Sequence, residues 1–252
     1  MLESFKRLFA GRGEDRDADQ SEVTEWAKRR GFGIKRVRGE EGFVIDGLLE
    51  GKPWRIEWGA SQRDYIVGRE LRLRMELDLP GDAQMLLLSR PLLETLERKT
   101  FEDFTDSVQT QIGTKTPEEM RWLVMFPKVD MAALKTLRTR FGAVASVPEA
   151  GLAWLTGLLG NALERAAADL LRDEPPFLLM TLRGRAYLRM QLLSPSADAI
   201  GTALALFETA VAQAVLVCAH SSGKSGDWSP SSASTAWQTL QPDEIADPRK
   251  RR

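Results

Sequence analysis

Alternating apolar and charged residues mark one segment of the chain most clearly, from Arg69 to Leu79. Every second residue there is apolar, namely Leu71, Leu73, Met75, Leu77 and Leu79. Charged residues, among them Arg72 and Arg74, stand between these positions. Because successive side chains of a strand point to opposite faces of its sheet, this spacing predicts a strand with one apolar and one ionic face.

Weaker alternation on both sides of this segment predicts further strands. Residues 43–49 and 54–58 repeat apolar side chains at every second position, and Gly51 between them predicts a tight hairpin. After the turn at Pro80-Gly81-Asp82, Gln84 to Ser89 is expected to return as the next strand. Together these runs predict an antiparallel meander.

Apolar residues three or four positions apart dominate the second half of the chain and predict helices. Helices are expected from about Glu22 to Arg30, from Asp130 to Phe141, from Pro148 to about Asp173, and from Ser194 to about Cys218. Strands are expected at Phe177 to Leu182 and at Ala186 to Leu193. Residues 116–126 are expected to form one or two helical turns followed by a short strand, Trp122 to Phe126.

These elements predict an α+β fold in which an antiparallel β-meander packs against long Ala/Leu-rich helices. Residues 1–20 are assigned to an amphipathic N-terminal segment and a charged linker, and residues 221–252 to a flexible tail. Between them, residues 21–114 form a strand-rich α+β lobe and residues 115–220 a helix-rich α+β lobe. Whether these are two lobes or two layers of one unit stays open.

Composition and charge favour a cytoplasmic protein. The 252 residues carry 35 basic and 36 acidic side chains, so no global field draws nucleic acid, and none is expected as a partner. The single cysteine, Cys218, cannot form an intramolecular disulfide, and no signal peptide is evident. Ile200 to Ala219 is long enough to span a membrane, but it contains Glu208 and Gln213 and is interpreted as a buried helix.

No catalytic, metal or cofactor motif stands out, and the catalytic residues are therefore unknown. His220 is the only histidine, and Cys218 lies about 200° away from it around a helix. One cysteine and one histidine cannot supply the four ligands of a structural zinc site. No glycine-rich segment has the spacing of a phosphate-binding loop. We therefore expect no cofactor, and the lack of catalytic motifs favours a protein that is not an enzyme.

Arginines on the polar sides of the predicted strands are the most distinctive remaining feature. Arg55, Arg72 and Arg74 are expected to be exposed and paired with Glu57, Glu76 and Asp78 on neighbouring strands. Arg183, Arg185 and Arg189 have no acidic neighbour in their own hairpin. This second group is therefore a candidate contact for an anion or for a partner surface.

Apolar residues near both chain ends favour a noncatalytic protein that acts through protein–protein interaction. Trp228 and Trp237 either anchor a partner or pack back on the body, and residues 1–10 suit a membrane surface, peripheral to the inner membrane. The Ala-rich helices are expected to pack on each other, either within one chain or across the axis of a homodimer. The alternative is a ligand-binding or enzymatic module, with an apolar cavity between a curved sheet and the C-terminal helix, lined by Trp54, Trp58 and the Leu71 to Leu79 face.

Overall fold

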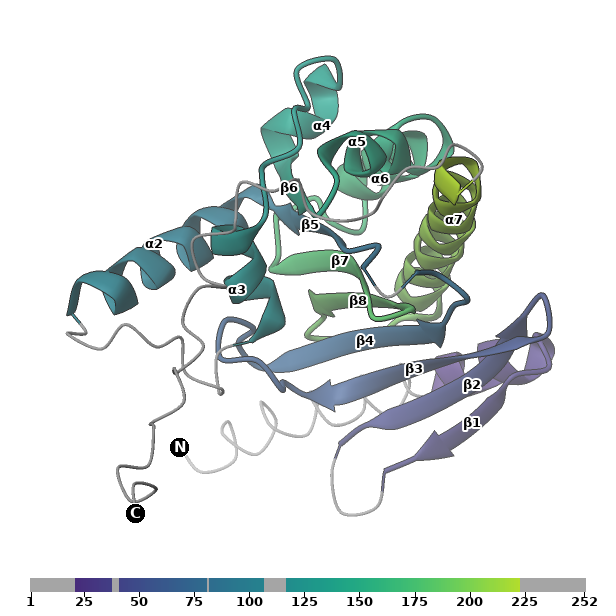
Figure 1. Ribbon diagram of the computed structural model, residues 1–252. Coiled ribbons are helices and arrows are strands. Elements are labelled where there is room, and N and C mark those ends of the chain that lie inside the picture. The colour runs from purple at the N-terminus through teal and green to yellow at the C-terminus, as the bar shows by residue number, and fades with distance from the viewer. Residues whose placement is uncertain (1–20, 38–40, 81, 107–116, 223–252) are drawn as a thin grey trace, which may run out of the picture.

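The computed structural model describes residues 21–37, 41–80, 82–106 and 117–222 (Figure 1). A helix at residues 21–29 is followed by β1 (Gly33–Arg36), β2 (Phe43–Leu49), β3 (Lys52–Ala60), β4 (Arg69–Glu76), β5 (Met85–Ser89), α2 (Arg90–Asp106) and α3 (Glu118–Met125). Then come α4 (Lys135–Arg140), β6 (Phe141–Ala145), α5 (Pro148–Leu155), α6 (Leu158–Ala168), β7 (Phe177–Leu182), β8 (Arg185–Gln191) and α7 (Ala197–Ser222).

The eight strands form one antiparallel sheet in the order β1-β2-β3-β4-β8-β7-β5-β6 (Figure 1). Strands β2, β3 and β4 are consecutive in the sheet, which confirms that part of the predicted meander. Glu50 and Gly51 both have positive φ angles, 50° and 80°, as a two-residue hairpin turn between β2 and β3 requires. The α+β fold with an antiparallel sheet is therefore confirmed.

Strand β5 differs from the prediction, because it does not return beside β4. Strand β8 pairs with β4 instead, and β5 lies between β7 and β6. The side chains explain the exchange: all five residues of β5 are buried, whereas β4 carries charged residues on one face. The same face of β8 is also charged, with Arg189 directly opposite Arg72. The predicted lobe boundary near residue 114 falls outside the described residues, and the division into lobes stays a prediction.

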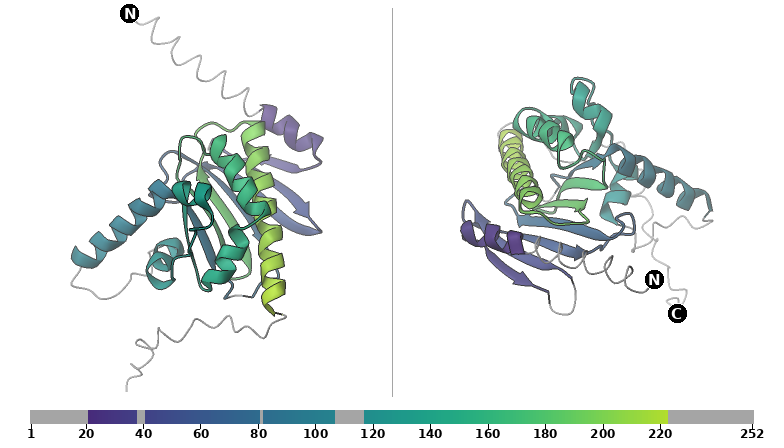
Figure 2. Two further views of the ribbon diagram at one scale, coloured as in Figure 1. Left: turned by 90° about the horizontal axis from the view of Figure 1, so that it is seen from above. Right: turned by 180° about the vertical axis from the view of Figure 1, so that it is seen from behind.

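Helices cover the two faces of the sheet unequally (Figures 1 and 2). On the first face, the helix at residues 21–29 and helices α5, α6 and α7 bury one continuous apolar core against the strands. On the second face, α2 and α3 pack on the β5, β6 and β7 end, where Leu96 and Trp122 contribute to a smaller cluster with Leu88 and Leu178. The second face of β2, β3, β4 and β8 is polar and lies beyond that cluster.

Three helical predictions are wrong in their bounds. The helix expected at residues 148–173 is two helices, because Gly157 has a φ of 79° and separates α5 from α6. The short strand expected at Trp122 to Phe126 is mostly helical, as part of α3. The helix expected to end at Phe141 is only α4, since residues 141–145 are all buried and pair with β5 as strand β6.

Helix α7 is the predicted long C-terminal helix, and it packs on α5 and α6 within the same chain. The indole N–H of Trp154 on α5 donates to the carbonyl of Ala210 at 2.9 Å. Residues 197–220 are long and apolar enough to cross a membrane by length and composition, yet half of the most apolar window is buried against the rest of the protein. Ile200, Leu204 and Phe207 lie in the main core.

Candidate functional site

Charged side chains cover the open half of the second sheet face. The part of it on β2, β3, β4 and β8 is called here the ionic face, and its charged residues and one tyrosine are Asp46, Arg55, Glu57, Glu70, Arg72, Arg74, Glu76, Arg185, Tyr187 and Arg189. They form rows across the strands: Arg72 lies between Glu57 and Arg189, and Arg74 lies between Arg55 and Tyr187. The ionic face thus follows directly from the period-two alternation of β3, β4 and β8.

Glu70, near the start of β4, fixes two of these arginines. Its carboxylate is fully buried, and Oε1 accepts from Nη1 of Arg189 at 2.7 Å. Oε2 accepts from Nη1 of Arg72 at 3.2 Å and from the backbone N–H of Gln62 at 2.8 Å. Both arginines are mostly buried, at 15% and 13% exposure. A buried carboxylate with several charge-assisted hydrogen bonds holds these guanidinium groups in one position.

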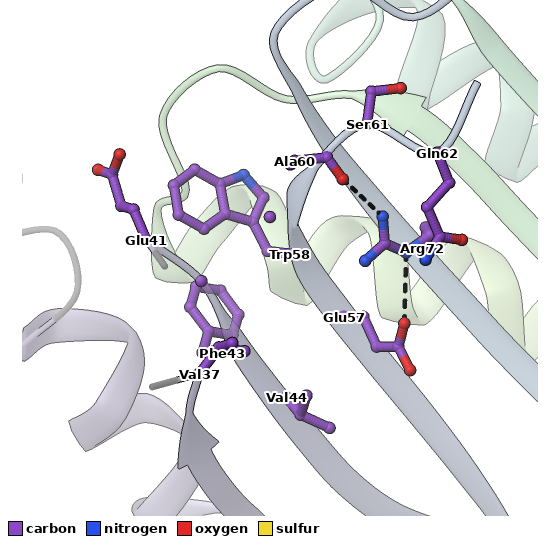
Figure 3. Close-up of a pocket in the computed structure, with 12 residues that line it drawn as sticks. Val37, Glu41, Phe43, Val44, Glu57, Trp58, Ala60, Ser61, Gln62 and Arg72 are labelled. Atoms are coloured by element: carbon purple, nitrogen blue, oxygen red, sulfur yellow. Dashed lines mark hydrogen bonds and ion pairs between the residues drawn. The ribbon is translucent and has the colours of Figure 1, made fainter. Parts of the chain in front are cut away.

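A groove of about 410 Å³ lies where the ionic face meets the end of β3 (Figure 3). Arg72 reaches it from β4 and donates through Nε to Glu57 at 3.3 Å and through Nη1 to the carbonyl of Ala60 at 2.9 Å. Trp58 and Gln62 complete this part of the lining. Because Arg72 already contacts two carboxylates and a carbonyl, the groove presents an organised ion pair rather than an uncompensated cation.

Arg74 and Arg55 are more accessible cations of the ionic face. Asp46 accepts two hydrogen bonds from Arg55, of 2.7 and 3.2 Å. The hydrogen bonding to Asp46 raises the pKa of Arg55, burial opposes it, and the charge of Asp46 adds to the increase. Arg74 is 55% exposed, and its ion pair is with Glu57 at 3.7 Å. Glu57 also forms an ion pair with Arg72, so the charge of Arg74 is less fully compensated than that of Arg55.

A second buried carboxylate, Glu119 on α3, lies beside the ionic face. Arg63 donates to its Oε1 at 2.6 Å, and the hydroxyl of Tyr65 donates to the same oxygen. Burial by itself would raise the pKa of Glu119, but the hydrogen bond and charge of Arg63, with the Tyr65 hydroxyl, lower it. Burial, followed by the charge of Glu119, raises the pKa of Tyr65. This cluster joins α3 to the segment between β3 and β4.

The three arginines predicted as an anion or partner contact lie along the same side of the sheet. Arg189 pairs with Glu70, Arg185 pairs with Glu76 at 2.7 Å, and Arg183 pairs with Glu118 on α3 at 3.3 Å. Their acidic partners come from other elements, so a comparison within the hairpin alone could not find them. Contact with an anion or partner stays a prediction. Trp228, Trp237 and residues 1–10 lie outside the described residues.

Arg55, Arg72 and Arg74 all pair with acids on neighbouring strands, but not always with the acids predicted. Arg72 and Arg74 pair with Glu57 across β3 and β4, as predicted. Arg55 pairs with Asp46 of β2 instead of an acid on β4. The two other expected acids have different partners: Glu76 contacts Arg185, and Asp78 contacts Lys52 at 2.6 Å.

Other residues considered for chemistry are apart or enclosed. The Cys218 side chain is buried, whereas His220 is exposed and its Nδ1 contacts the carbonyl of Leu216 at 2.7 Å. Within the described ranges, no group of three histidine, cysteine or acidic side chains is arranged to hold a metal ion. Trp54, Trp58 and Leu71, proposed above as the lining of an apolar cavity, are at most 2% exposed and belong to the main core.

Sequence reasoning missed the two buried carboxylates and Tyr65. Glu70 shares its strand face with Arg72 and Arg74, so the alternation of β4 already placed it on the ionic face. Its burial depends on the distant strand β8, which no local pattern reveals. Glu119 lies in the first turn of α3, and nothing in the local sequence relates it to Arg63, which is 56 residues earlier.

Comparisons with known proteins give little further guidance. No protein-family model matches the sequence, and no curated protein matches it. Among solved structures, the chain is similar to the crystal structure of the mycobacterial trehalose monomycolate transport factor A. The identity is 8%, the TM-score is 0.44, and the match covers 77% of this chain and 92% of that chain. A likeness at this level says nothing about what this chain binds.

Proposed function

We propose that this protein is a noncatalytic interaction protein whose ionic face binds an acidic surface of a protein partner. The observation that carries the proposal is the fixation of Arg72 and Arg189 by the buried Glu70 carboxylate. Ordinary surface arginines are flexible, and ordering them on binding costs conformational entropy. On the ionic face, Arg72 and Arg189 are already ordered, and they support a surface on which Arg74 and Arg185 are the more exposed cations.

The charge of the ionic face favours an acidic partner. It has five arginines, namely Arg55, Arg72, Arg74, Arg185 and Arg189, and four carboxylates, namely Asp46, Glu57, Glu70 and Glu76. The surplus is one positive charge, whereas the whole chain has a net charge of -1. The surplus is best accessible at Arg74, which is 55% exposed. A contact of this kind gains specificity and association rate from charge complementarity.

Site-specific photocrosslinking in cells tests this proposal. A benzophenone amino acid replaces Leu48, which is 67% exposed and shares its side of the sheet with Asp46. The control position is Leu158 on α6, which is 68% exposed. We expect one protein to be crosslinked at position 48 and not at position 158.

Charge reversal and salt then identify the interaction as electrostatic. Arg74→Glu combined with Arg185→Glu should reduce that crosslink at least about tenfold. The purified pair should also bind more weakly as the salt concentration rises. Equal adducts at both positions, or a crosslink that survives charge reversal in a folded variant, would overturn the proposal.

A further inference from the structure

An apolar groove of about 450 Å³ runs between α5 and α7, among the helices on the side of the sheet opposite the ionic face. Ala150 and Ala153 line it from α5, and Leu216, Val217 and His220 line it from α7. Leu216 is 50% exposed, and its neighbour Val215 is 42% exposed. The groove therefore leaves large aliphatic side chains open at its C-terminal end.

The outward side of α7 continues this apolar character. Four exposed residues share one side of this helix, because they are spaced by seven, four and three positions: Ala205, Ala212, Leu216 and Ala219. Glu208 and Thr209 border this side, so the uncovered apolar surface of α7 is a stripe of these four residues and not the whole helix. The described residues cover only the inner side of α7, through the main core.

The chain itself supplies a segment that can reach the groove. Helix α7 ends at Ser222, two residues after the groove residue His220, and the chain continues to Arg252. Trp228 is six residues beyond Ser222, a reach of up to about 20 Å. Leu216 lies six helical residues before Ser222, only about 9 Å along the helix axis. The connection is therefore long enough for Trp228 to turn back to Leu216.

We propose that Trp228 docks in the α5–α7 groove of its own chain. An indole contributes a large apolar surface and keeps a polar N–H at its edge, which suits a half-open apolar groove. The covalent link places Trp228 at an effective local concentration in the millimolar range. Lys224 in the connection carries the charge opposite to that of Glu149, which also lines the groove. This inference is independent of the proposed function of the ionic face.

Limited proteolysis of the full chain tests the docking. Chymotrypsin cleaves after Trp228, and the rate is compared between the wild type, Leu216→Asp in the groove and Leu158→Asp on α6. We expect Leu216→Asp to speed cleavage after Trp228 at least about fivefold, because a carboxylate in the groove opposes burial of the indole. Leu158→Asp should leave the rate unchanged. Equal rates in wild type and folded Leu216→Asp would overturn the docking.

Hydrogen exchange gives a second readout that leaves the groove unaltered. Trp228→Ala should increase amide exchange in the last two turns of α7, whereas Trp237→Ala should not. No increase with Trp228→Ala would contradict the proposal. Sedimentation velocity identifies a different occupant: a wild-type dimer that Leu216→Asp converts to monomer would assign the groove to a second copy of the chain and reject docking of Trp228.

Discussion

Oε1 of Glu70 on β4 accepts a hydrogen bond of 2.7 Å from Nη1 of Arg189 on β8, across 119 positions of sequence. The carboxylate is fully buried and the guanidinium is 13% exposed. A one-residue shift of β8 would turn Arg189 to the apolar face and leave Glu70 without this partner. The pair therefore helps to select one register where strands from distant parts of the chain meet.

Replacing Glu70 by glutamine should destabilise the fold strongly. The variant keeps the shape of the side chain but leaves the mostly buried Arg189 without its carboxylate, and breaking a buried ion pair costs about 3–5 kcal/mol. Urea unfolding followed by circular dichroism measures the free energy of unfolding. Glu76→Gln is the control: Glu76 is 73% exposed, and its solvent-screened pair with Arg185 should contribute little to stability. Similar losses in both variants would contradict this ranking.

The buried Glu119 cluster should make stability depend on acid pH. The folded-state pKa of Glu119 lies below its ordinary value of 4.5, so the carboxylate contributes stability above that pH and loses it as the pH falls through the folded pKa. Glu119→Gln removes the titrating group. We expect the stability difference between wild type and variant to be largest near neutral pH and to shrink below about pH 4. A difference independent of pH would show that Glu119 acts through packing alone.

Cys218 should react slowly with thiol reagents in the folded protein. Burial, with a smaller effect of the Asp82 charge, raises its pKa to about 11. At pH 8, roughly one molecule in a thousand then carries the reactive thiolate, and the side chain is also shielded. Iodoacetamide labelling followed by mass spectrometry should be slow in buffer and complete in guanidinium chloride. Rapid labelling of the native chain would refute the buried position of this thiol.

Gly47→Ala should destabilise the contact between β2 and β3. A Cβ at this position would lie 2.1 Å from Cζ2 of Trp54, which is buried in the main core beside Phe32. The indole must move, and such overpacking typically costs about 1–3 kcal/mol. Gly33→Ala on edge strand β1 is the control, because its Cβ would lie 3.8 Å from the backbone oxygen of Asp46, an ordinary contact distance. Thermal unfolding compares the melting temperatures of the two variants. Equal melting temperatures for the two variants would contradict the expectation.

Local periodicity predicted the strands that have one apolar and one polar face. The alternation of apolar and charged residues predicts β4, and in the structure Leu71, Leu73 and Met75 are buried while the arginines lie on the other side. The turn between the strands expected at Phe177 to Leu182 and at Ala186 to Leu193 also has a local cause, because Gly184 adopts the positive φ, 72°, that this turn requires. In both cases, the residues that determine the structure are neighbours in the sequence.

Strand β6, which is buried on both sides, could not be assigned in the same way. Strand β6 contains Phe141 and Gly142, which resemble the end of a helix until β5 is known to pair with them. The ionic face was only half visible for a related reason. The sequence shows that the β7–β8 hairpin is rich in arginine. It does not show that Arg185 and Arg189 are held by carboxylates, because those acids come from β4.

The position of β5 between β7 and β6 has a consequence for biosynthesis. Strand β5 is complete at Ser89, but its two neighbours begin only at Phe141 and Phe177. Until those residues leave the ribosome, five consecutive residues that are buried in the finished protein have no sheet to join. Pairings between distant segments form slowly, and exposed apolar strands promote aggregation. In the nascent chain, β5 is therefore open to self-association until β7, which ends at Leu182 of 252 residues, has left the ribosome.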